Sequence, residues 1–451
     1  MAKTYESYKD SGIAWIGEIP SEWKVGLVGR YFNEIKNPNI NQEEKNTLQF
    51  KMGDIISKKR GDSKYNPETI EAYNVVEPGT IMINGLNLSF DFISQRVGQV
   101  HEKGAITSTY LALYPSNGMM SDYAKYLLKA YDNCKALHAM GRGLRATLSY
   151  GIFRSEPILI PSIDEQHSIA SFLDTKCGEI DSLISLQEEM ISELQAYKQS
   201  VITEAVTKGL DPNAKMNCCA SREKNDACIS SSETQPAIER KFKDSGVEWI
   251  GEIPEGWEVL ALKRIFKIIA GATPKSENEA YWDGDIAWIT PADYKTEQKY
   301  VSFGRRNLSE QGYHACSTVL LPKGSIVFSK RAPIGLVAIT ERELCTNQGC
   351  LGCVPIRDVS NVFMYYLLSV YTEQFELYGS GTTFKEISAN NFANFKLMLP
   401  PLSEQQAIAS YLDDKTSQID SLISLKQQKI DELKDYKKSI IYEYVTGKKR
   451  V

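Results

Sequence analysis

The sequence predicts an α+β fold: two small α/β domains joined by two long helices packed as an antiparallel coiled coil, with an internal pseudo-twofold repeat. The segment YKDSGIAWIGEIPSEWKV from Tyr8 returns from Phe242 as FKDSGVEWIGEIPEGWEV. Similarly, IASFLDTKCGEIDSLISL from Ile169 returns from Ile408 as IASYLDDKTSQIDSLISL. The two offsets, 234 (242 − 8) and 239 (408 − 169), nearly agree, so one long unit is duplicated. Between these blocks the halves barely resemble each other, so a shared frame carries two divergent inserts.

The end of each repeat has the composition of a long helix. Residues 163–207 contain no Pro and one Gly, and Gly209 follows as a stop signal. Apolar residues recur there, and again in the second repeat, at the 3.5-residue spacing of a coiled coil. We expect these residues to pack the helices: Ile169, Leu173, Ile180, Leu183, Met190, Leu194, Ile408, Leu412, Ile419, Leu422 and Leu433. At about 1.5 Å per residue, each helix of about forty residues would span about 60 Å and act as a spacer. The alternative is that each helix simply covers its own domain.

Five segments follow from this pattern. We expect an N-terminal segment with the first insert (1–159), the first long helix (160–210), a polar linker (211–240), the second repeat segment and insert (241–398), and the second long helix (399–451). The hydrophobic fraction of 42% is ordinary for a soluble protein. No apolar run approaches membrane length and the first residues, MAKTYESYKDSG, lack a signal-peptide core, so we expect a cytoplasmic protein without membrane contact.

The net charge of −5 argues against a simple polycation that coats nucleic acid. The inserts at residues 26–159 and 260–399 are nevertheless each slightly positive, while the linker and the flanking segments hold the excess of acid. A protein that binds phosphates needs only a local positive surface. The overall charge therefore does not exclude DNA as a partner.

The two inserts share an order of elements although their residues differ. Short apolar runs between Gly, Pro and Asn turns predict a strand-rich core in each, as in VVEPGTIMINGLNLS from Val75 and VLLPKGSIVFSKRAP from Val319. A helical stretch follows in both, from Asp122 and from Asn361. Each insert then enters a Gly-x-Gly loop, GRGLRATLS or GSGTTFKEIS, and returns through an apolar strand. We therefore predict a small α/β domain for each insert.

No catalytic motif stands out. The chain lacks the N-P-P-[FY] or D-P-P-[YF] tetrapeptide of DNA methyltransferases and the G-x-x-x-x-G-K-[ST] phosphate loop of motor nucleases. Its four histidines have no ligand spacing, and Cys345, Cys350 and Cys353 lie in an apolar run that is more typical of buried strand thiols than of a zinc site. We expect no catalytic residue, no metal and no cofactor.

The duplicated motifs resemble those of the specificity subunit of type I restriction-modification enzymes. W-I-G-E-I-P opens each half, E-Q-x-x-I-A-S-[FY]-L-D opens each helix at Glu165 and Glu404, and YWDGDIAWITPADY from Tyr281 resembles a boundary of that family's target recognition domains. Taken singly, an E-Q pair could be mere capping chemistry, with Ser403 as the N-cap. The resemblance covers essentially the whole chain.

It implies a non-catalytic, DNA-binding specificity subunit with two target recognition domains. Each domain would read one half of an interrupted, asymmetric target in double-stranded DNA, and the helices would set the spacing. Methyltransferase (modification) subunits, two of them, would dock on the helices. Whether restriction or translocase subunits also bind is left open. A coiled-coil adaptor that joins two protein-binding domains without reading DNA is the alternative.

Charged and polar residues near turns are the candidates for DNA contact. Cations give affinity and register, whereas Asn, Asp, Thr or Arg side chains on loops can read base edges. In the first insert the candidates are Lys58, Lys59, Arg60, Lys64, Asn84, Asn87, Asp91, Arg142 and Arg145. In the second they are Lys275, Thr290, Asp293, Arg305, Arg306, Lys330, Arg331 and Lys385. For any one of these, an ordinary solvated surface residue is the competing interpretation.

Overall fold

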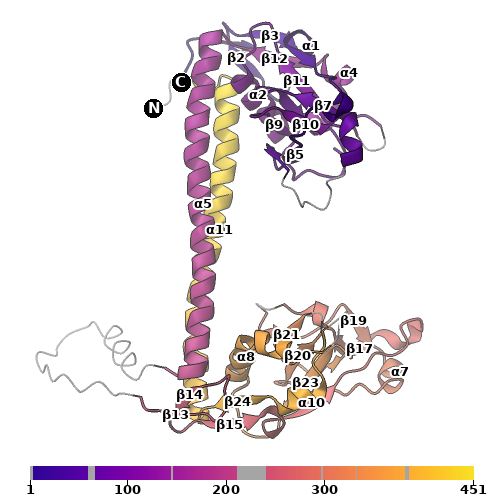
Figure 1. The fold of residues 1–451 in the computed structure, drawn as a ribbon, viewed down its shortest axis with the longest axis vertical. Helices are drawn as coiled ribbons and strands as arrows, with labels where there is room; N and C mark the ends of the chain where they lie inside the picture. Colours follow the sequence, from indigo (N-terminus) through magenta and orange to yellow (C-terminus); the bar gives the residue numbers. More distant parts are fainter. Residues whose placement is uncertain are drawn as a thin grey trace, which may run out of the picture. The chain divides into compact units, whose positions relative to one another are not determined.

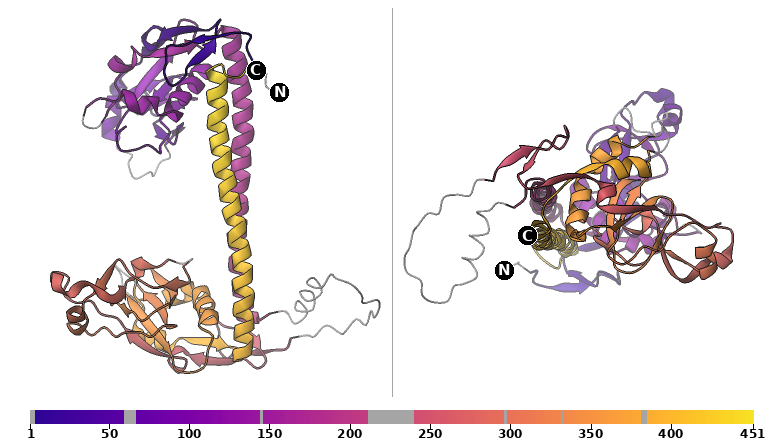
Figure 2. Two further views of the ribbon diagram at one scale, coloured as in Figure 1. Left: turned by 180° about the vertical axis from the view of Figure 1, so that it is seen from behind. Right: turned by 90° about the horizontal axis from the view of Figure 1, so that it is seen from below.

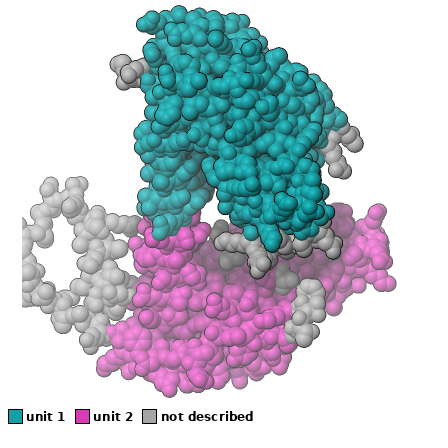
Figure 3. All heavy atoms as spheres, turned by 45° about the horizontal axis from the view of Figure 1, so that its top comes forward, with its two compact units in different colours: residues 1–190, 425–451 teal, residues 191–424 magenta. Residues whose placement is uncertain are grey.

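The computed structural model describes residues 4–58, 67–143, 146–210, 240–295, 298–331, 333–380 and 385–451. The chain divides into two compact units (Figure 3). Unit 1 holds residues 1–190 and 425–451, and unit 2 holds residues 191–424. Each long helix, α5 (Ile163–Lys208) and α11 (Leu402–Val445), contributes one part to each unit. Each unit thus combines one insert with parts of both helices.

Unit 1 is built on a four-stranded antiparallel sheet with the order β4-β11-β8-β9 (Figure 1). The helix α2 (Ser121–Asn133) packs on this sheet, and its Tyr123, Leu127 and Ala130 are buried. The other elements are β1 (Tyr8–Asp10), β2 (Glu18–Pro20), β3 (Lys24–Leu27), α1 (Val28–Tyr31), β4 (Phe32–Glu34), η1 (Ile40–Gln42), β5 (Leu48–Lys51), β6 (Asp54–Ser57), η2 (Pro67–Ala72), β7 (Tyr73–Val76), β8 (Ile81–Ile83), β9 (Val97–Gln99), β10 (Gly104–Thr107), β11 (Leu111–Pro115), α3 (Ala136–Met140), α4 (Tyr150–Phe153) and β12 (Pro157–Ile160).

Unit 2 has a five-stranded sheet with the order β16-β23-β20-β21-β18. The helix α8 (Asn361–Val370) packs on it, and a three-stranded sheet of β19, β17 and β22 is added. The other elements are β13 (Phe242–Asp244), β14 (Glu252–Pro254), β15 (Glu258–Ala261), η3 (Leu262–Arg264), β16 (Phe266–Ala270), η4 (Glu279–Tyr281), β17 (Trp282–Ile289), η5 (Pro291–Asp293), β18 (Tyr300–Val301), β19 (Arg306–Leu308), α7 (Glu310–His314), β20 (Ile326–Lys330), β21 (Ile334–Thr340), β22 (Cys345–Thr346), β23 (Cys350–Pro355), α9 (Thr372–Leu377), α10 (Ala389–Asn394) and β24 (Lys396–Leu399).

The two sheets use the same strand order when each unit is followed along the chain. The strands β4, β8, β9 and β11 of unit 1 occupy the places of β16, β20, β21 and β23 in unit 2. The predicted mixture of helices and strands is confirmed. In unit 2, the strands β17, β19 and β22 and the helix α7 have a small core of their own around Trp282, Trp288 and Leu308.

The duplicated E-Q motif fastens the start of each long helix to its unit. The buried Trp23 indole donates to Glu165 (Nε1 to Oε1, 3.2 Å), and the buried Trp257 indole donates to Glu404 (Nε1 to Oε2, 3.0 Å). In α5, Ser162 and Glu165 also form a capping box. In α11 the helix begins at Leu402, so Ser403 lies inside it and is not the N-cap that the sequence suggested.

The glutamines of this motif are buried and bind backbone groups of the adjoining loop. The Gln166 amide donates to the Gly118 carbonyl and accepts from the Met120 N–H, at 3.0 and 2.9 Å. Gln405 donates to Pro400 and accepts from the Ser360 N–H, at 2.8 and 2.9 Å. Because the loop leads directly into α2 or α8, each glutamine fixes the insert on its long helix. Capping alone would not bury the glutamines, so the motif is more than a helix start.

A second repeated contact lies further along each helix. Lys125 and the Tyr126 hydroxyl both donate to Asp174, at 2.7 Å each. In unit 2, Lys299 and Tyr366 donate to Asp413, which is 239 residues beyond Asp174 (413 − 174). Burial lowers the pKa of Lys299, but its hydrogen bonds to Asp413 and Tyr366 outweigh this and raise it. The lysine is therefore kept charged against the helix.

Within each unit, the segments of α5 and α11 lie side by side (Figures 1 and 2). In unit 1, Lys437 contacts Asp181 at 2.6 Å and Lys426 contacts Gln187 at 3.3 Å. Residue numbers thus rise along one helix as they fall along the other, so the two segments are antiparallel. In unit 2, Lys198 and Asp420 form the ion pair equivalent to Asp181–Lys437.

The burial of the helix residues corrects part of the expected seam. Ile169, Leu173, Ile180, Ile408, Leu412 and Ile419 are buried, and Met190, Leu194 and Leu433 are partly buried. Leu183 and Leu422, in contrast, are 47% and 48% exposed, so their expected packing between the helices is wrong. Ile184, one residue after Leu183, is buried instead. Across the described residues, no helix combines the length and apolar character needed to cross a membrane.

Candidate nucleic-acid interface

In unit 1, two loops that carry predicted site residues are joined by backbone hydrogen bonds. Residues 84–96 connect β8 to β9 and include Asn84, Asn87 and Asp91. Gly85 accepts from the Leu148 N–H at 2.9 Å, and Leu88 donates to Ala146 at 3.1 Å, so this connection is fastened to the Gly-x-Gly loop. That loop presents Arg142 in solvent. The structure thus brings one candidate cation to the loop that carries the candidate base readers.

Unit 2 contains the same junction with different side chains. The Ile387 N–H donates to the Lys330 carbonyl at 3.0 Å, and position 387 is 239 beyond Leu148 (387 − 148). Here the connection between β20 and β21 is only residues 331–333. Glu386 pairs with Lys330 at 2.7 Å and with Arg331 at 3.6 Å, while Lys385 is exposed beside it. The shared backbone thus supports unlike chemistry, which is what two readers of different sequences require.

The carboxylate of Asp91 makes its contacts within its own loop. It accepts from the backbone N–H groups of Ile93 and Ser94, at 3.1 and 2.9 Å, and pairs with the buried Arg96 at 3.3 Å. The hydrogen bonds from Ser94 lower the pKa of Asp91 to about 2. Asp91 therefore anchors its own loop, and its expected role as a base reader stays a prediction.

Thr290 and Asp293 also differ from expectation. They close a capping box at η5, in which the Asp293 carboxylate accepts from the Thr290 N–H and hydroxyl at 2.8 and 2.7 Å. The other carboxylate oxygen accepts from the Arg305 N–H at 3.1 Å, and the Asp293 side chain is only 4% exposed. Neither residue is thus free to read a base. Their effect is to orient Arg305, whose side chain is 77% exposed.

The remaining unit 2 candidates lie apart from this cluster. Arg306 stacks over Trp282, with its guanidinium carbon 4.3 Å from the ring centroid, and pairs with Asp283 at 3.5 Å. Lys275 is exposed after β16. These two contacts hold Arg306 on β19, whereas no described contact places Lys275 in a site.

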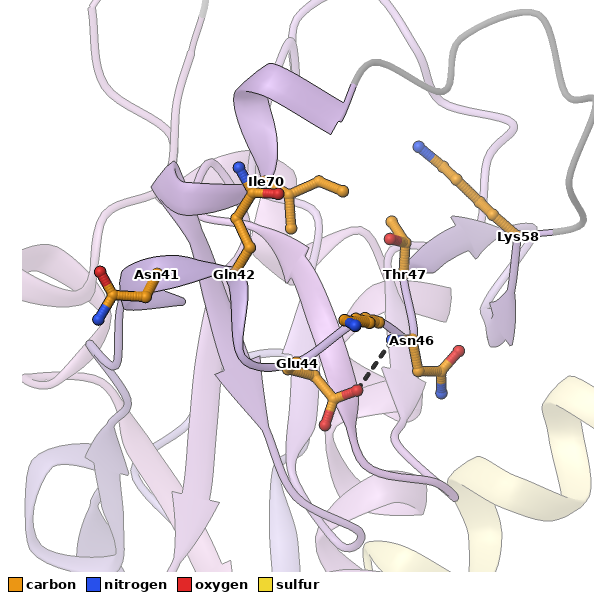
Figure 4. A pocket seen from close by; sticks show the side chains of 8 residues that line it. Asn41, Gln42, Glu44, Asn46, Thr47, Lys58 and Ile70 are labelled. Atoms are coloured by element: carbon orange, nitrogen blue, oxygen red, sulfur yellow. Dashed lines mark hydrogen bonds between the residues drawn. The ribbon is translucent and has the colours of Figure 1, made fainter.

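Lys58 borders a polar hollow of about 430 Å³ at the edge of unit 1 (Figure 4). The lining residues are Asn41, Gln42, Glu44, Lys45, Asn46, Thr47, Lys58 and Ile70. Glu44 accepts from the Asn46 N–H at 2.8 Å, and the buried Thr47 hydroxyl has no partner among the described residues. Such a lining suits a polar or phosphate group. Lys59, Arg60, Lys64 and Arg145, also predicted, lie outside the described residues.

Comparison with known proteins shows which family this chain resembles. The model of one family, the type I restriction modification DNA specificity domain, matches residues 254–435. The putative MjaX specificity subunit of Methanocaldococcus jannaschii is 26% identical over 97% of this chain and 96% of its own length. The MjaIX specificity subunit of the same organism is 39% identical, but over only 39% of this chain and 41% of its own length. The chain is thus similar to type I restriction-modification specificity subunits along almost its whole length.

Solved structures of type I systems have the same fold. A chain from a study of complex assembly and conformational transition in a type I restriction-modification system aligns with a TM-score of 0.70, covering 95% of this chain and 99% of that one. The HsdS subunit of Thermoanaerobacter tengcongensis aligns with a TM-score of 0.50 over 95% of this chain and 98% of its own. Both are 15% identical to this chain. At this identity the similarity shows the fold alone, and the contacts of this chain have to be argued from its own residues.

Three cysteines of the second insert are poorly suited to binding a metal. Cys345, Cys350 and Cys353 are buried in β22 and β23, and burial raises the pKa of Cys345 to about 11 and that of Cys350 to about 12. A thiol has to lose its proton to bind a metal. Among the described residues, no three His, Cys, Asp or Glu side chains come together as a metal site would require.

Sequence reasoning missed three features of the interface. Arg96, which anchors the 84–96 connection, is fully buried, although arginine is normally a surface residue. Glu386, which pairs with two candidate cations, follows Lys385 but was not singled out. The apolar side chains at Phe90, Phe92 and Ile93 are exposed. The alternation in SFDFIS resembles a strand, so only the fold reveals these as loop residues.

Proposed function

We propose that this protein is the non-catalytic, DNA-reading subunit of a type I restriction-modification complex. Each unit would read one half of a bipartite, asymmetric target in double-stranded DNA, and the two helices would set the unread gap. The protein would act in the cytoplasm and would need no cofactor of its own. The observation that carries the proposal is the loop junction: the same backbone contacts recur in both units, but the side chains on them differ.

An antiparallel coiled coil with a pseudo-twofold axis is the proposed spacer. Support comes from positions that are 239 residues apart in the repeat. Gln187 and Lys426 are such a pair (426 − 187) and contact each other at 3.3 Å, as equivalent residues do at a twofold axis. The ion pair Asp181–Lys437 likewise has Asp420–Lys198 as its counterpart. Two domains carried by such a pair of helices would meet successive turns of DNA, which recur about every 34–36 Å.

The helices also carry a proposed docking surface for two methyltransferase subunits. Large apolar side chains are exposed at equivalent positions of the two copies: Leu183 and Leu422, Leu186 and Leu425, and Tyr197 and Tyr436. Exposed apolar side chains that recur at matched places mark contact with a partner rather than chance. One such set in each helix suits two copies of one partner. Restriction or translocase subunits would join this assembly where the system includes them.

Methylated-base sequencing tests the proposal. In strains with and without this gene, together with its methyltransferase gene, we expect one interrupted, non-palindromic motif to be methylated only when the gene is present. The purified complex should bind a duplex with that motif, and its affinity should fall by about 10³-fold between 50 and 200 mM salt if six or more phosphates are contacted. Arg305→Ala should lower the salt slope by about one, whereas Lys243→Ala, an exposed frame lysine on β13, should leave it unchanged.

A protein adaptor is the competing function, because paired helices that hold two domains could equally join proteins. An adaptor would leave the methylation pattern unchanged and would show neither motif preference nor steep salt dependence. The exposed cations at the loop junctions favour the DNA reader.

A further inference from the structure

The connection between β8 and β9 is the largest difference between the two loop junctions. In unit 1 it comprises residues 84–96, whereas its counterpart in unit 2 comprises residues 331–333. The middle of the long connection carries three large apolar side chains that are exposed to solvent. Phe90 is 75% exposed, Phe92 is 55% exposed and Ile93 is 87% exposed. We name these three residues the apolar tip. Scattered single apolar residues are normal on a surface, but three within four positions of one loop indicate a contact site.

The apolar tip stands on a rigid base. The buried Arg96 guanidinium donates to the carbonyls of Leu86 and Asp91, at 2.6 and 2.7 Å, and pairs with the Asp91 carboxylate at 3.3 Å. The Arg96 N–H in turn donates to the buried Asp132. Because these bonds close the loop before any partner binds, the tip loses little conformational freedom on insertion.

A stacking contact supports the tip from the side. The Phe92 ring lies on the His138 ring, with centroids 5.0 Å apart and planes 18° from parallel, and His138 is within 3.1 Å of the Asp91 carbonyl. Phe92 is thereby partly covered, and Phe90 and Ile93 are left as the outermost side chains.

The surroundings of the tip favour DNA over protein as its partner. The same connection carries Asn84 and Asn87, and its backbone is bonded to the loop that presents Arg142. At the matching place in unit 2, Lys385 is exposed and Arg331 is partly exposed, whereas Lys330 is only 15% exposed and pairs with Glu386. A surface where exposed cations flank polar base readers is the setting in which proteins insert an apolar wedge between base pairs. The cores of protein interfaces are instead poor in charge.

We infer that the apolar tip inserts Phe90 and Ile93 as a wedge between neighbouring base pairs of the half-site read by unit 1. This inference rests on the proposed function. The wedge unstacks one step and kinks the duplex, which adds readout of DNA deformability to direct base contacts. Flexible pyrimidine–purine steps are unstacked most readily, so such a step should lie at the insertion point.

The test uses the intact complex with its methyltransferase and a duplex that carries the methylated motif. 2-Aminopurine is placed in turn at each position of both half-sites. With the wild type we expect increased fluorescence at one step. The double variant F90S/I93S should abolish this increase and weaken binding about tenfold or more, while the salt slope stays the same because no phosphate contact is lost. Leu27→Ser, at an exposed leucine on the frame strand β3, is the matched control and should behave as the wild type.

Each other result has a distinct meaning. If the wild type binds the motif but F90S/I93S binds equally well with the same fluorescence, the wedge is overturned and the proposed function stands. If the double variant keeps its duplex affinity but no longer co-purifies with the methyltransferase, the tip is a protein contact, which also overturns the wedge. If the wild type binds no duplex, the proposed function and the wedge fail together.

Discussion

At the scale of single residues, the duplicated E-Q motifs attach the start of each long helix to its insert. Gln166 and Gln405 are buried amides that satisfy a loop N–H and carbonyl groups, and Glu165 and Glu404 each accept from a buried tryptophan. A buried polar group left without its partner costs about 1–3 kcal/mol. In both copies these residues therefore hold the insert in place on its long helix.

A substitution pair at neighbouring positions tests this role. Gln405→Leu leaves the Ser360 N–H and the Pro400 carbonyl unsatisfied, and should lower the free energy of unfolding of unit 2 by about 1–3 kcal/mol. Gln406→Leu, at the exposed next position, should change it by less than about 0.5 kcal/mol. Thermal unfolding followed by circular dichroism makes the comparison. Equal melting temperatures for the two variants would show that the buried Gln405 amide does not stabilise unit 2.

At the scale of elements, the long helices explain why the heptad pattern predicted a buried Leu183 that is in fact half exposed. Leu183 follows Ile180 and Leu173 at coiled-coil spacing, yet it is half exposed and Ile184 is buried. A straight helix has 3.6 residues per turn, so a 3.5-residue pattern drifts by about 20° per heptad. The contact stripe thus moves to Ile184 and leaves Leu183 and its counterpart Leu422 on the outside.

Adjacent substitutions separate helix packing from partner docking. Ile184→Asp places a charge at a buried position of α5 and should lower the melting temperature by about 5–10 °C. Leu183→Asp should leave the melting temperature of the isolated chain almost unchanged but reduce the amount of methyltransferase that co-purifies with it. Calorimetry and pull-down provide the two readouts. A large loss of stability in Leu183→Asp would instead show that Leu183 packs between the two helices.

At the scale of the whole molecule, the proposed function uses one frame twice. The offset of 239 residues relates the joints at Asp174 and Asp413, the ion pairs of Asp181 and Asp420, and the loop contacts of Leu148 and Ile387. Since the framework is the same and the loops differ, the half-sites should differ in sequence, and the helices should decide the distance between them.

Lengthening both helices tests the spacer. Insertion of four residues at equivalent points, near Gln187 in α5 and Lys426 in α11, adds about one turn, or about 6 Å. We expect the unread gap to grow by one or two base pairs of about 3.4 Å each, with both half-sites unchanged. Methylated-base sequencing measures the gap. The same four residues inserted between residues 211 and 240, in the predicted linker, should not alter it, and an unaltered gap in the helix variant would contradict the spacer.

The sequence alone determined the duplicated frame, the two long helices and the α/β inserts, because each is written in local patterns that repeat: turn residues, apolar periodicity and the matched motifs. It also placed Arg142, Arg305 and Arg331 near exposed turns, where a cation is usually solvated. These features depend on neighbours in the chain, so a single sequence contains them.

Only the tertiary structure decided which polar residues are free to act. Asp91, Thr290 and Asp293 looked like base readers, but their oxygens are used by backbone groups and arginines of their own loops. The burial of Arg96 and the exposure of Leu183 were likewise invisible in the sequence. Hydrogen-bond partners and burial come from segments distant in the chain, and a polar side chain already satisfied within the fold has little left to offer DNA.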